Sequence, residues 1–163
     1  MEKKEPKLKI TDEKLALAKI KNWCAYQERC QQETRDKLYE YGLWPEAVEN
    51  IISTLISENF VNEERFAKLY AGGKFRIKKW GRIKIKNALK QKKITDYCIK
   101  KAIAEIDENE YILTLKKLLE IKGKQIKETS KIKKNYKLLQ YAYSRGYEQD
   151  LISDLLNLSN ERQ

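Results

Sequence analysis

The sequence predicts an all-α protein made of three tandem three-helix repeats, arranged as an elongated array that can curve. Apolar residues recur at helical spacing along most of the chain, and no alternating strand pattern or hairpin turn competes with them. The pattern also returns with a period of about fifty residues, which is typical of helical arrays. The three matching sets are Leu38, Gly42, Leu43, Val48 and Ile52, then Leu89, Lys93, Ile94, Ile99 and Ile103, then Ala142, Gly146, Tyr147, Ile152 and Leu156.

The first repeat is expected over residues 11–60, after a charged, mobile tail at residues 1–10. Asp12–Glu13 indicates a helix start, because a side-chain cap and an early acid both stabilise a first turn. Gly42 can close the second helix in a left-handed conformation, and Pro45 suits the first turn of the third. The expected inward-facing side chains are Ala16, Ile20, Trp23, Cys24, Gln27, Thr34, Leu38, Tyr41, Val48, Ile51, Ile52, Leu55 and Ile56.

The second repeat is expected over residues 61–106. Asn62 is a candidate N-cap, and Glu63–Glu64 places negative charge where the helix dipole favours it. Trp80–Gly81 then interrupts the apolar pattern and separates the first helix from the second. Helices are expected from Asn62, from about Arg82, and from Thr95 or Asp96. The apolar stripe of the first is Phe66, Leu69, Tyr70, Gly73 and Ile77, and that of the second is Ile85, Ala88 and Leu89.

The third repeat is expected over residues 107–158, followed by a short tail at residues 159–163. Gly123 is expected to end its first helix, and a lysine-rich loop then runs to about Lys131. Gly146 ends the next helix, and a last helix follows. The expected buried residues are Tyr111, Leu115, Leu118, Leu119, Tyr136, Leu139, Ala142, Tyr143, Leu151, Ile152, Leu155 and Leu156.

The composition limits the possible functions. The 163 residues have a net charge of +11, a pI near 9.4 and a mean hydropathy of −0.77. This excess of positive charge favours nucleic acid, an anionic membrane surface or an acidic protein as partner. No apolar run has the length of a membrane span, and the N-terminus lacks the apolar core of a signal peptide, so we expect a cytoplasmic protein.

Catalytic and metal-binding patterns are missing from the sequence. Histidine is absent, and Cys24, Cys30 and Cys98 lack CxxC spacing, which argues against a zinc site or a disulfide framework. We expect these cysteines to be buried, reduced thiols. No phosphate-binding glycine loop is present, and the acids at 107–110 are placed to cap a helix. The sequence therefore predicts no enzyme, no cofactor and no metal.

A one-sided basic stretch is the strongest functional pattern. Between Glu64 and Glu105 the only carboxylate is Asp96, whereas lysine and arginine recur throughout. A helix face of this kind is typical of a surface that binds a polyanion or an acidic protein, although a solvated face is the simpler alternative. The predicted contact residues are Lys74, Arg76, Lys78, Lys79, Arg82, Lys86, Lys90 and Lys93. Arg76 and Arg82 are favoured among them, because a guanidinium binds phosphate or carboxylate through two hydrogen bonds.

Three nearby residues allow two interpretations each. Arg29 and Arg65 lie beside acids, so they can pair within the chain or contact a partner. Trp80 can stack on a nucleobase, but burial between helices is the favoured interpretation for a large aromatic residue.

Three segments carry a resemblance to a known family. The first is Arg29–Thr34 with Lys37–Leu38 and Gly42, the second is Phe60–Ala67, and the third runs from Trp80 to Ile94. They resemble the RecX family, the regulators of the bacterial RecA recombinase. In the first segment, Cys30 replaces the serine of the family pattern and Thr34 its leucine. The family has a glycine where this chain has Lys93, so that helix end is expected to close differently. The resemblance extends over about residues 14–158, and in the third repeat it is a match of pattern only.

The resemblance implies a repeated three-helix fold and a negative regulator without catalytic activity. Members of the family bind in the groove of the RecA–DNA filament, bridge neighbouring protomers, and limit filament growth, ATP hydrolysis and strand exchange. The implied partners are the RecA filament and single- or double-stranded DNA. The DNA would be contacted through its phosphates, and the protein is expected to be a monomer.

Three other functions compete with this one. A stand-alone DNA-binding protein would suit the charge, and short helices joined by tight turns resemble helix-turn-helix units. The candidate helices present mainly lysine, however, which favours phosphate over base edges. A small nuclease would need a carboxylate cluster for Mg²⁺, and the acids at 107–110 lie at a helix start, where they are expected to serve as a cap. A scaffold of stacked repeats that only binds other proteins also remains open.

Overall fold

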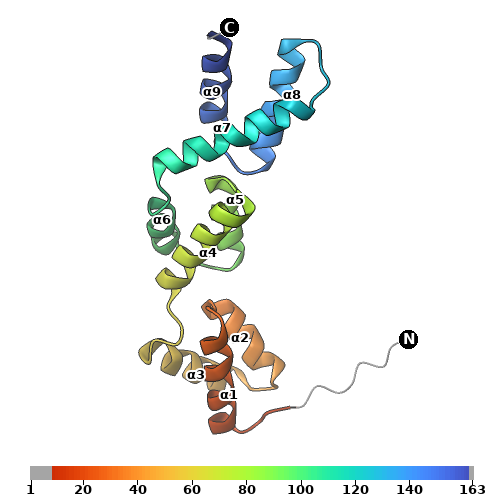
Figure 1. Cartoon of the computed structure of the whole chain (residues 1–163). Helices are drawn as coiled ribbons and strands as arrows, with labels where there is room; N and C mark the ends of the chain where they lie inside the picture. Colours follow the sequence, from red (N-terminus) through yellow and green to blue (C-terminus); the bar gives the residue numbers. More distant parts are fainter. Residues whose placement is uncertain (1–8, 162–163) are drawn as a thin grey trace, which may run out of the picture. The chain divides into compact units, whose positions relative to one another are not determined.

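The computed structural model describes residues 9–161, with side chains described to residue 157, and over this range the chain forms nine helices and no strand (Figure 1). The prediction of an all-α fold is confirmed. Residues 1–8 and 162–163 of the predicted tails lie outside the described residues. The helices are α1 Glu13–Tyr26, α2 Gln31–Glu40, α3 Pro45–Ser57, α4 Glu63–Lys78, α5 Arg82–Gln91, α6 Asp96–Ala104, α7 Glu108–Gln125, α8 Lys131–Ser144 and α9 Gln149–Glu161.

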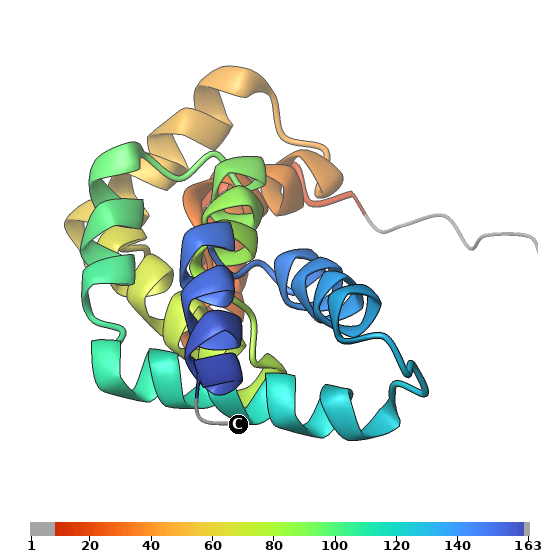
Figure 2. The same ribbon diagram turned by 90° about the horizontal axis from the view of Figure 1, so that it is seen from above.

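The described chain divides into two compact units. The first comprises the residues up to Phe66 together with Lys92–Ile94, and the second comprises Ala67–Gln91 and the residues from Thr95 onward. In the second unit, α7 and α8 lie side by side and form a helical hairpin (Figure 1 and Figure 2). The division into repeats at residues 60/61 and 106/107 stays a prediction.

The first unit has one apolar core to which α1, α2 and α3 all contribute. Ile10 belongs to this core, and its N–H donates to the carbonyl of Tyr41 at 2.8 Å. The predicted tail was therefore too long, because burial and a backbone hydrogen bond fix Ile10. The tail predicted at the other end was also too long, since α9 runs to Glu161. Ile56 was predicted to be buried, but 44% of it is exposed.

The helix starts follow the expected chemistry. Asp12 caps α1, and Asn62 Oδ1 accepts the N–H of Arg65 at 2.9 Å at the start of α4. Cys30 caps α2 reciprocally, because its Sγ accepts the N–H of Glu33 and the Glu33 carboxylate accepts the N–H of Cys30. Pro45 occupies the first turn of α3, as predicted.

Three turns have the same left-handed backbone at matching places in the sequence pattern. Gly42 and Gly146 have φ of 95° and 97°, and Lys93 has φ of 58°. The expectation that the chain closes differently at Lys93 was wrong, because a lysine adopts there the conformation that glycine adopts elsewhere. This conformation strains a residue with a Cβ.

The predicted buried face of α4 was rotated from the observed one. Leu69 and Ile77 are 55% and 77% exposed, whereas Ala67, Ala71 and Phe75 are buried. The buried residues are spaced four apart and include two alanines, so the packing selects small side chains over larger apolar ones. Aliphatic size alone therefore pointed to the wrong face.

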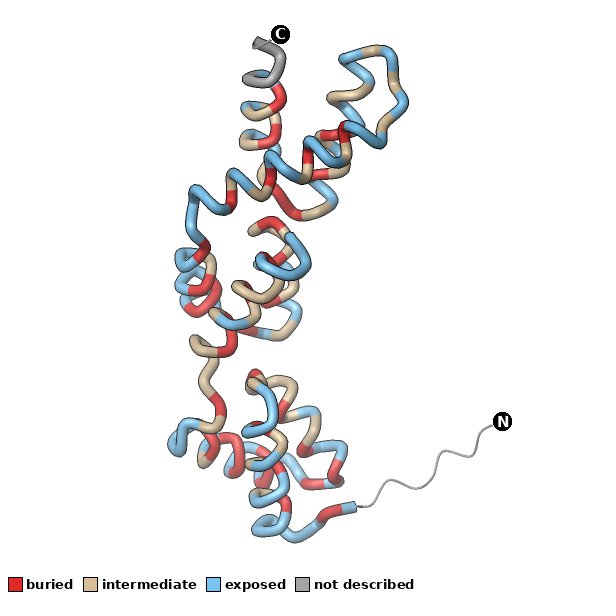
Figure 3. Tube along the Cα trace, in the orientation of Figure 1, coloured by how far each residue is buried: buried red, intermediate tan, exposed pale blue. Residues whose placement is uncertain are grey.

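The third predicted repeat needs a similar correction. Gly123 does not end α7 but lies buried inside it, with Leu138 beside it. Tyr136 and Tyr143 were predicted to be buried, but 60% and 57% of them are exposed. The buried residues of α8 are Leu138 and Ala142, of which Ala142 was predicted and Leu138 was not. Figure 3 shows how buried and exposed segments alternate along these helices.

Candidate functional site

The predicted basic surface lies on the end of α4 and on α5. We call Lys74, Arg76, Lys78, Lys79, Arg82, Lys86 and Lys90 the basic face, all in the second unit. Within it, five side chains are exposed and two are half-buried, namely Lys74 and Arg82. Lys93 is exposed as well, but it belongs to the first unit.

Trp80 organises the lysines around the turn between α4 and α5. The Nζ of Lys74 lies 4.9 Å from the centroid of the Trp80 ring, and the Nζ of Lys84 lies 4.7 Å from it. Lys74 also lies 5.3 Å from the Tyr70 ring. Trp80 is half-buried, in keeping with the preference for packing over free stacking. The ring attracts both ammonium groups through its negative face and so holds two charges near each other.

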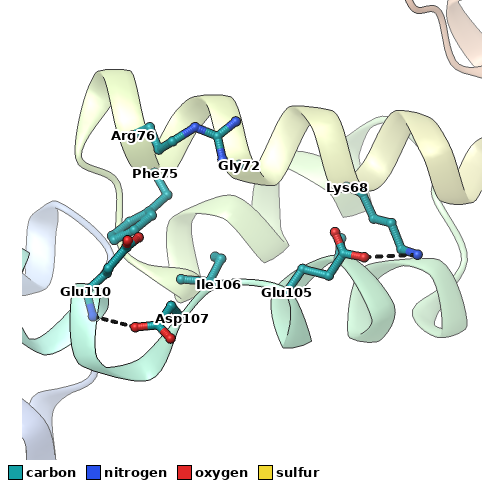
Figure 4. A pocket seen from close by; sticks show the side chains of 9 residues that line it. Lys68, Gly72, Phe75, Arg76, Glu105, Ile106, Asp107 and Glu110 are labelled. Carbon is teal, nitrogen blue, oxygen red and sulfur yellow. Dashed lines mark hydrogen bonds and ion pairs between the residues drawn. The ribbon is translucent and has the colours of Figure 1, made fainter.

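Arg76 borders a small pocket between α4 and the α6–α7 connection. The pocket has a volume of about 110 Å³, and Lys68, Phe75, Glu105 and Glu110 also line it (Figure 4). Lys68 and Glu105 form an ion pair of 3.1 Å along one side. The Arg76 guanidinium lies along Gly72, since a Cβ added there would be 2.9 Å from Nη1. Arg76 is therefore exposed, and its charge lies beside a pocket that is lined by both acidic and basic side chains.

Arg82 has a different role from the exposed members of the basic face. Its guanidinium donates to Glu148 at 3.0 Å and to Glu108, and it stacks on the Tyr111 ring with Cζ 3.9 Å from the centroid. Only 19% of the Arg82 side chain is exposed. Two carboxylates and an aromatic ring already hold this guanidinium. Arg82 is therefore not free to bind a phosphate or carboxylate of a partner through two hydrogen bonds.

Two buried tyrosines complete this cluster. The Tyr111 hydroxyl accepts the backbone N–H of Arg82 at 3.0 Å and donates to Glu148. Burial, followed by the hydrogen bond to Glu148, raises the pKa of Tyr111, and burial also raises the pKa of Tyr147. The Tyr147 hydroxyl donates to the Lys79 carbonyl at 2.9 Å. Both hydroxyls therefore stay protonated and tie the turn at residues 79–82 to α7 and to the start of α9.

The turn between α4 and α5 lies directly against the turn between α8 and α9. The N–H of Gly81 donates to the Arg145 carbonyl at 2.8 Å, and the N–H of Ile83 donates to the Gly146 carbonyl at 2.9 Å. A Cβ at Gly81 would overlap the backbone of Gly146. The glycine is thus required for close backbone approach, and this contact fixes where α5 begins.

Arg29 and Arg65 were each expected either to pair within the chain or to contact a partner, and both lie in the first unit. Arg65 pairs with Glu28 at 2.8 Å, so the structural interpretation applies to it. Arg29 stacks on Trp23, with Cζ 4.0 Å from the ring centroid, and its buried Nε has no hydrogen-bond partner. Lys92 pairs with Glu33 at 2.7 Å.

The central segment matches a known family. Residues 62–103 match the model described as RecX, second three-helix domain. The Regulatory protein RecX of Lactobacillus johnsonii is 29% identical over 148 residues, which are 89% of this chain and 55% of that protein. The Regulatory protein RecX of Thermotoga petrophila is 31% identical over 136 residues, which are 81% of this chain and 76% of that protein. The chain belongs to the RecX family.

Solved RecX structures share the fold. The crystal structure of RecX from Lactobacillus salivarius superposes with a TM-score of 0.82 at 22% identity, covering 89% of this chain and 94% of that one. A second crystal structure of a regulatory protein RecX gives the same TM-score at 19% identity and is covered over 71% of its length. The chain spans 55% and 60% of the length of the RecX proteins from L. johnsonii and Clostridium perfringens.

The matched RecX segment contains the whole basic face. The exposed lysines lie on α4, on α5 and in the turn between them, and sequence reasoning grouped Arg82 with them. It missed Glu108, Tyr111 and Glu148 as partners of Arg82. Only Gly81 indicated a close contact in the sequence, because a residue without a Cβ lets another backbone approach closely.

A metal site and a membrane-spanning helix each set requirements that can be compared with the described residues. Within residues 9–157, no three Cys, Asp or Glu side chains converge as a metal site would require. No helix in the described part is long and apolar enough to cross a membrane.

Proposed function

We propose that this protein binds RecA–DNA filaments and limits their extension, their ATP hydrolysis and strand exchange. The observation that supports this most is the exposed basic face inside the segment that matches the RecX second three-helix domain. The names of its relatives identify them as RecX regulatory proteins. We further propose that it acts as a cytoplasmic monomer and needs no cofactor.

The proposed contacts are electrostatic. Arg76, Lys78, Lys79, Lys86 and Lys90 are exposed and can meet DNA phosphates or the carboxylates of a filament. Lysine contacts to phosphate give affinity that does not depend on base sequence and that falls as salt rises. Lys74 is held against Trp80 and can add a fixed charge. Lys93, in the first unit, stays a separate predicted contact.

Arg82 supports this surface rather than contacting the partner. Its ion pairs with Glu108 and Glu148 hold the start of α5, so the lysines one and two turns later have a defined direction. Replacing Arg82 would leave the Glu148 and Glu108 carboxylates without their cation. Variants that test the contact should therefore spare Arg82 and use Lys86 and Lys90.

A stand-alone DNA-binding protein is the second candidate. The net charge of +11 favours it, because this much positive charge attracts any nucleic acid. It differs from the first proposal in needing no recombinase.

The test is the single-stranded-DNA-dependent ATP hydrolysis of RecA, titrated with this protein at two salt concentrations beside a DNA-only binding control. Filament regulation predicts inhibition when the protein is substoichiometric to RecA, with a steep salt dependence. Inhibition that appears only when the DNA itself is saturated would favour the stand-alone binder instead.

A further inference from the structure

A second basic region lies outside the basic face, on the hairpin formed by α7 and α8. Between Lys122 and Lys137 the chain has seven lysines and one carboxylate, Glu128, giving a local charge of about +6. Glu128 already pairs with Lys137 at 3.5 Å. Figure 3 shows the connection between the two helices as exposed or half-buried along its length.

Helix stability does not explain where these lysines are placed. The first turn of α8 contains no acid, and Lys131, Lys133 and Lys134 all lie within it or directly after it. Cations there oppose the helix dipole and destabilise the first turn. The seven other helices that have an acid in the first turn follow the favourable pattern, so α8 and the basic α5 stand apart from them.

The outer side of α8 also exposes apolar and aromatic surface. Ile132 is 84% exposed, Tyr136 is 60% exposed and Tyr143 is 57% exposed. Their spacing of four and seven residues places them on one stripe of the helix, and Lys133 and Lys137 lie beside this stripe. Leu138 and Ala142, on another side of α8, pack into the fold. The tyrosines are thus not needed for the core.

Lysines beside exposed aromatic rings fit one class of partner. Single-stranded nucleic acid offers phosphates for the lysines and unpaired bases for the rings, whereas the bases of a duplex are stacked on one another and out of reach. Tyr136 and Tyr143 are two helical turns apart, about 10 Å along the axis. An acidic protein surface would use the lysines but would not need two exposed tyrosines in line with them.

We propose that the outer side of α8 and the α7–α8 connection form a binding site for single-stranded nucleic acid. The lysines contact the phosphates, and Tyr136 and Tyr143 stack on bases. This site is separate from the basic face, so it goes beyond the filament contact proposed above. It gives the protein a preference for single strands that the lysines of α5 cannot supply.

The test is fluorescence anisotropy of a labelled oligothymidylate and of a labelled duplex, each titrated with the full chain. The charge variant is Lys127→Glu/Lys133→Glu, since both side chains are exposed and a glutamate in the first turn favours α8. Its matched control is Lys14→Glu/Lys100→Glu, which makes the same change of net charge at exposed lysines elsewhere. The stacking variant is Tyr136→Ala/Tyr143→Ala, and circular dichroism checks that all three are folded.

The charge variant should bind the oligothymidylate about tenfold more weakly, and the slope of log K against log salt concentration should be shallower by roughly 1.4. Its control should change the affinity by less than about threefold. The stacking variant should lose about tenfold for the single strand and little for the duplex. Equal losses in the charge variant and its control, or an unchanged single-strand affinity in the stacking variant, would overturn the site. Lys86→Glu/Lys90→Glu should weaken binding of the single strand and of the duplex alike, whereas the stacking variant should affect the single strand alone, so failure here is distinct from failure of the proposed filament contact.

Discussion

At the scale of single residues, backbone geometry decides more than side-chain chemistry in this chain. Gly81 lies so close to Gly146 that no side chain fits between them, whereas Gly73 has nothing within 4 Å of the place where a Cβ would be. The two glycines are only eight positions apart, and one is essential where the other is replaceable. Backbone geometry also matters at Lys93, whose left-handed backbone conformation suits glycine better than lysine.

Replacing Gly81 with alanine should destabilise the protein by about 3 kcal/mol, because the new methyl group would overlap the Gly146 backbone. Gly73→Ala is the matched control, and it should stabilise α4 by roughly 0.5–1 kcal/mol. Urea denaturation measures both. Similar effects of the two changes would mean that the close contact between the turns is absent.

Replacing Lys93 with glycine should raise the free energy of unfolding by roughly 0.5–1 kcal/mol, since it relieves the left-handed strain at φ 58°. The reverse change, Gly42→Lys, should lower stability by about 1 kcal/mol at a turn of the same kind. A less stable Lys93→Gly protein would show that the side chain makes contacts that outweigh the strain.

Cys30 should contribute a pH dependence at alkaline pH. Burial raises the pKa of its thiol from 9.0 to about 11. The unfolded chain therefore ionises first, and the contribution is complete below pH 9 and is lost as pH rises to 11. The free energy of unfolding should fall more steeply over this range in the wild type than in Cys30→Ser, in which a hydroxyl oxygen takes the place of the capping sulfur. Parallel curves of the free energy of unfolding against pH would contradict the raised pKa of the buried thiol.

At the scale of helices, the ends could be predicted from the sequence better than the faces. Caps depend on one side chain and its nearest N–H groups, so Asp12 and Asn62 were found from local chemistry. The start of α6 was predicted at Thr95 or Asp96, and Thr95 is its N-cap. Which face of a helix is buried depends on neighbours far along the chain. In α4 and α8, large apolar residues occur on more than one face, and only the packing of Ala71 or Leu138 selects among them. The partners of Arg82 were missed for the same reason.

The rotation of α4 can be tested by two truncations. Phe75→Ala should cost about 3–5 kcal/mol, because Phe75 is 5% exposed and its ring packs against Tyr111. Leu69→Ala should change stability by less than about 0.5 kcal/mol, because Leu69 lies at the surface. Chemical denaturation compares them, and a larger cost at Leu69 would restore the face that the sequence predicted.

At the scale of the whole molecule, charge and family point to the same function. The net charge of +11 is concentrated in two places, the basic face and the α7–α8 hairpin, and the first lies in the segment that matches the RecX model. The sequence alone was enough for the family, the fold class and the exposed lysines. It could not separate a lysine that faces solvent from an arginine that holds the fold, since both are simply basic in the sequence.

The most direct test of the proposed function is co-sedimentation of this protein with preformed RecA filaments on single-stranded DNA. Wild type, Lys86→Glu/Lys90→Glu and the control Lys14→Glu/Lys100→Glu would be compared at low and moderate salt. We expect the wild type and the control to pellet with filaments at low salt, and the α5 variant to bind at least about tenfold more weakly. Equal binding by the folded α5 variant, or no binding by the wild type, would contradict the account.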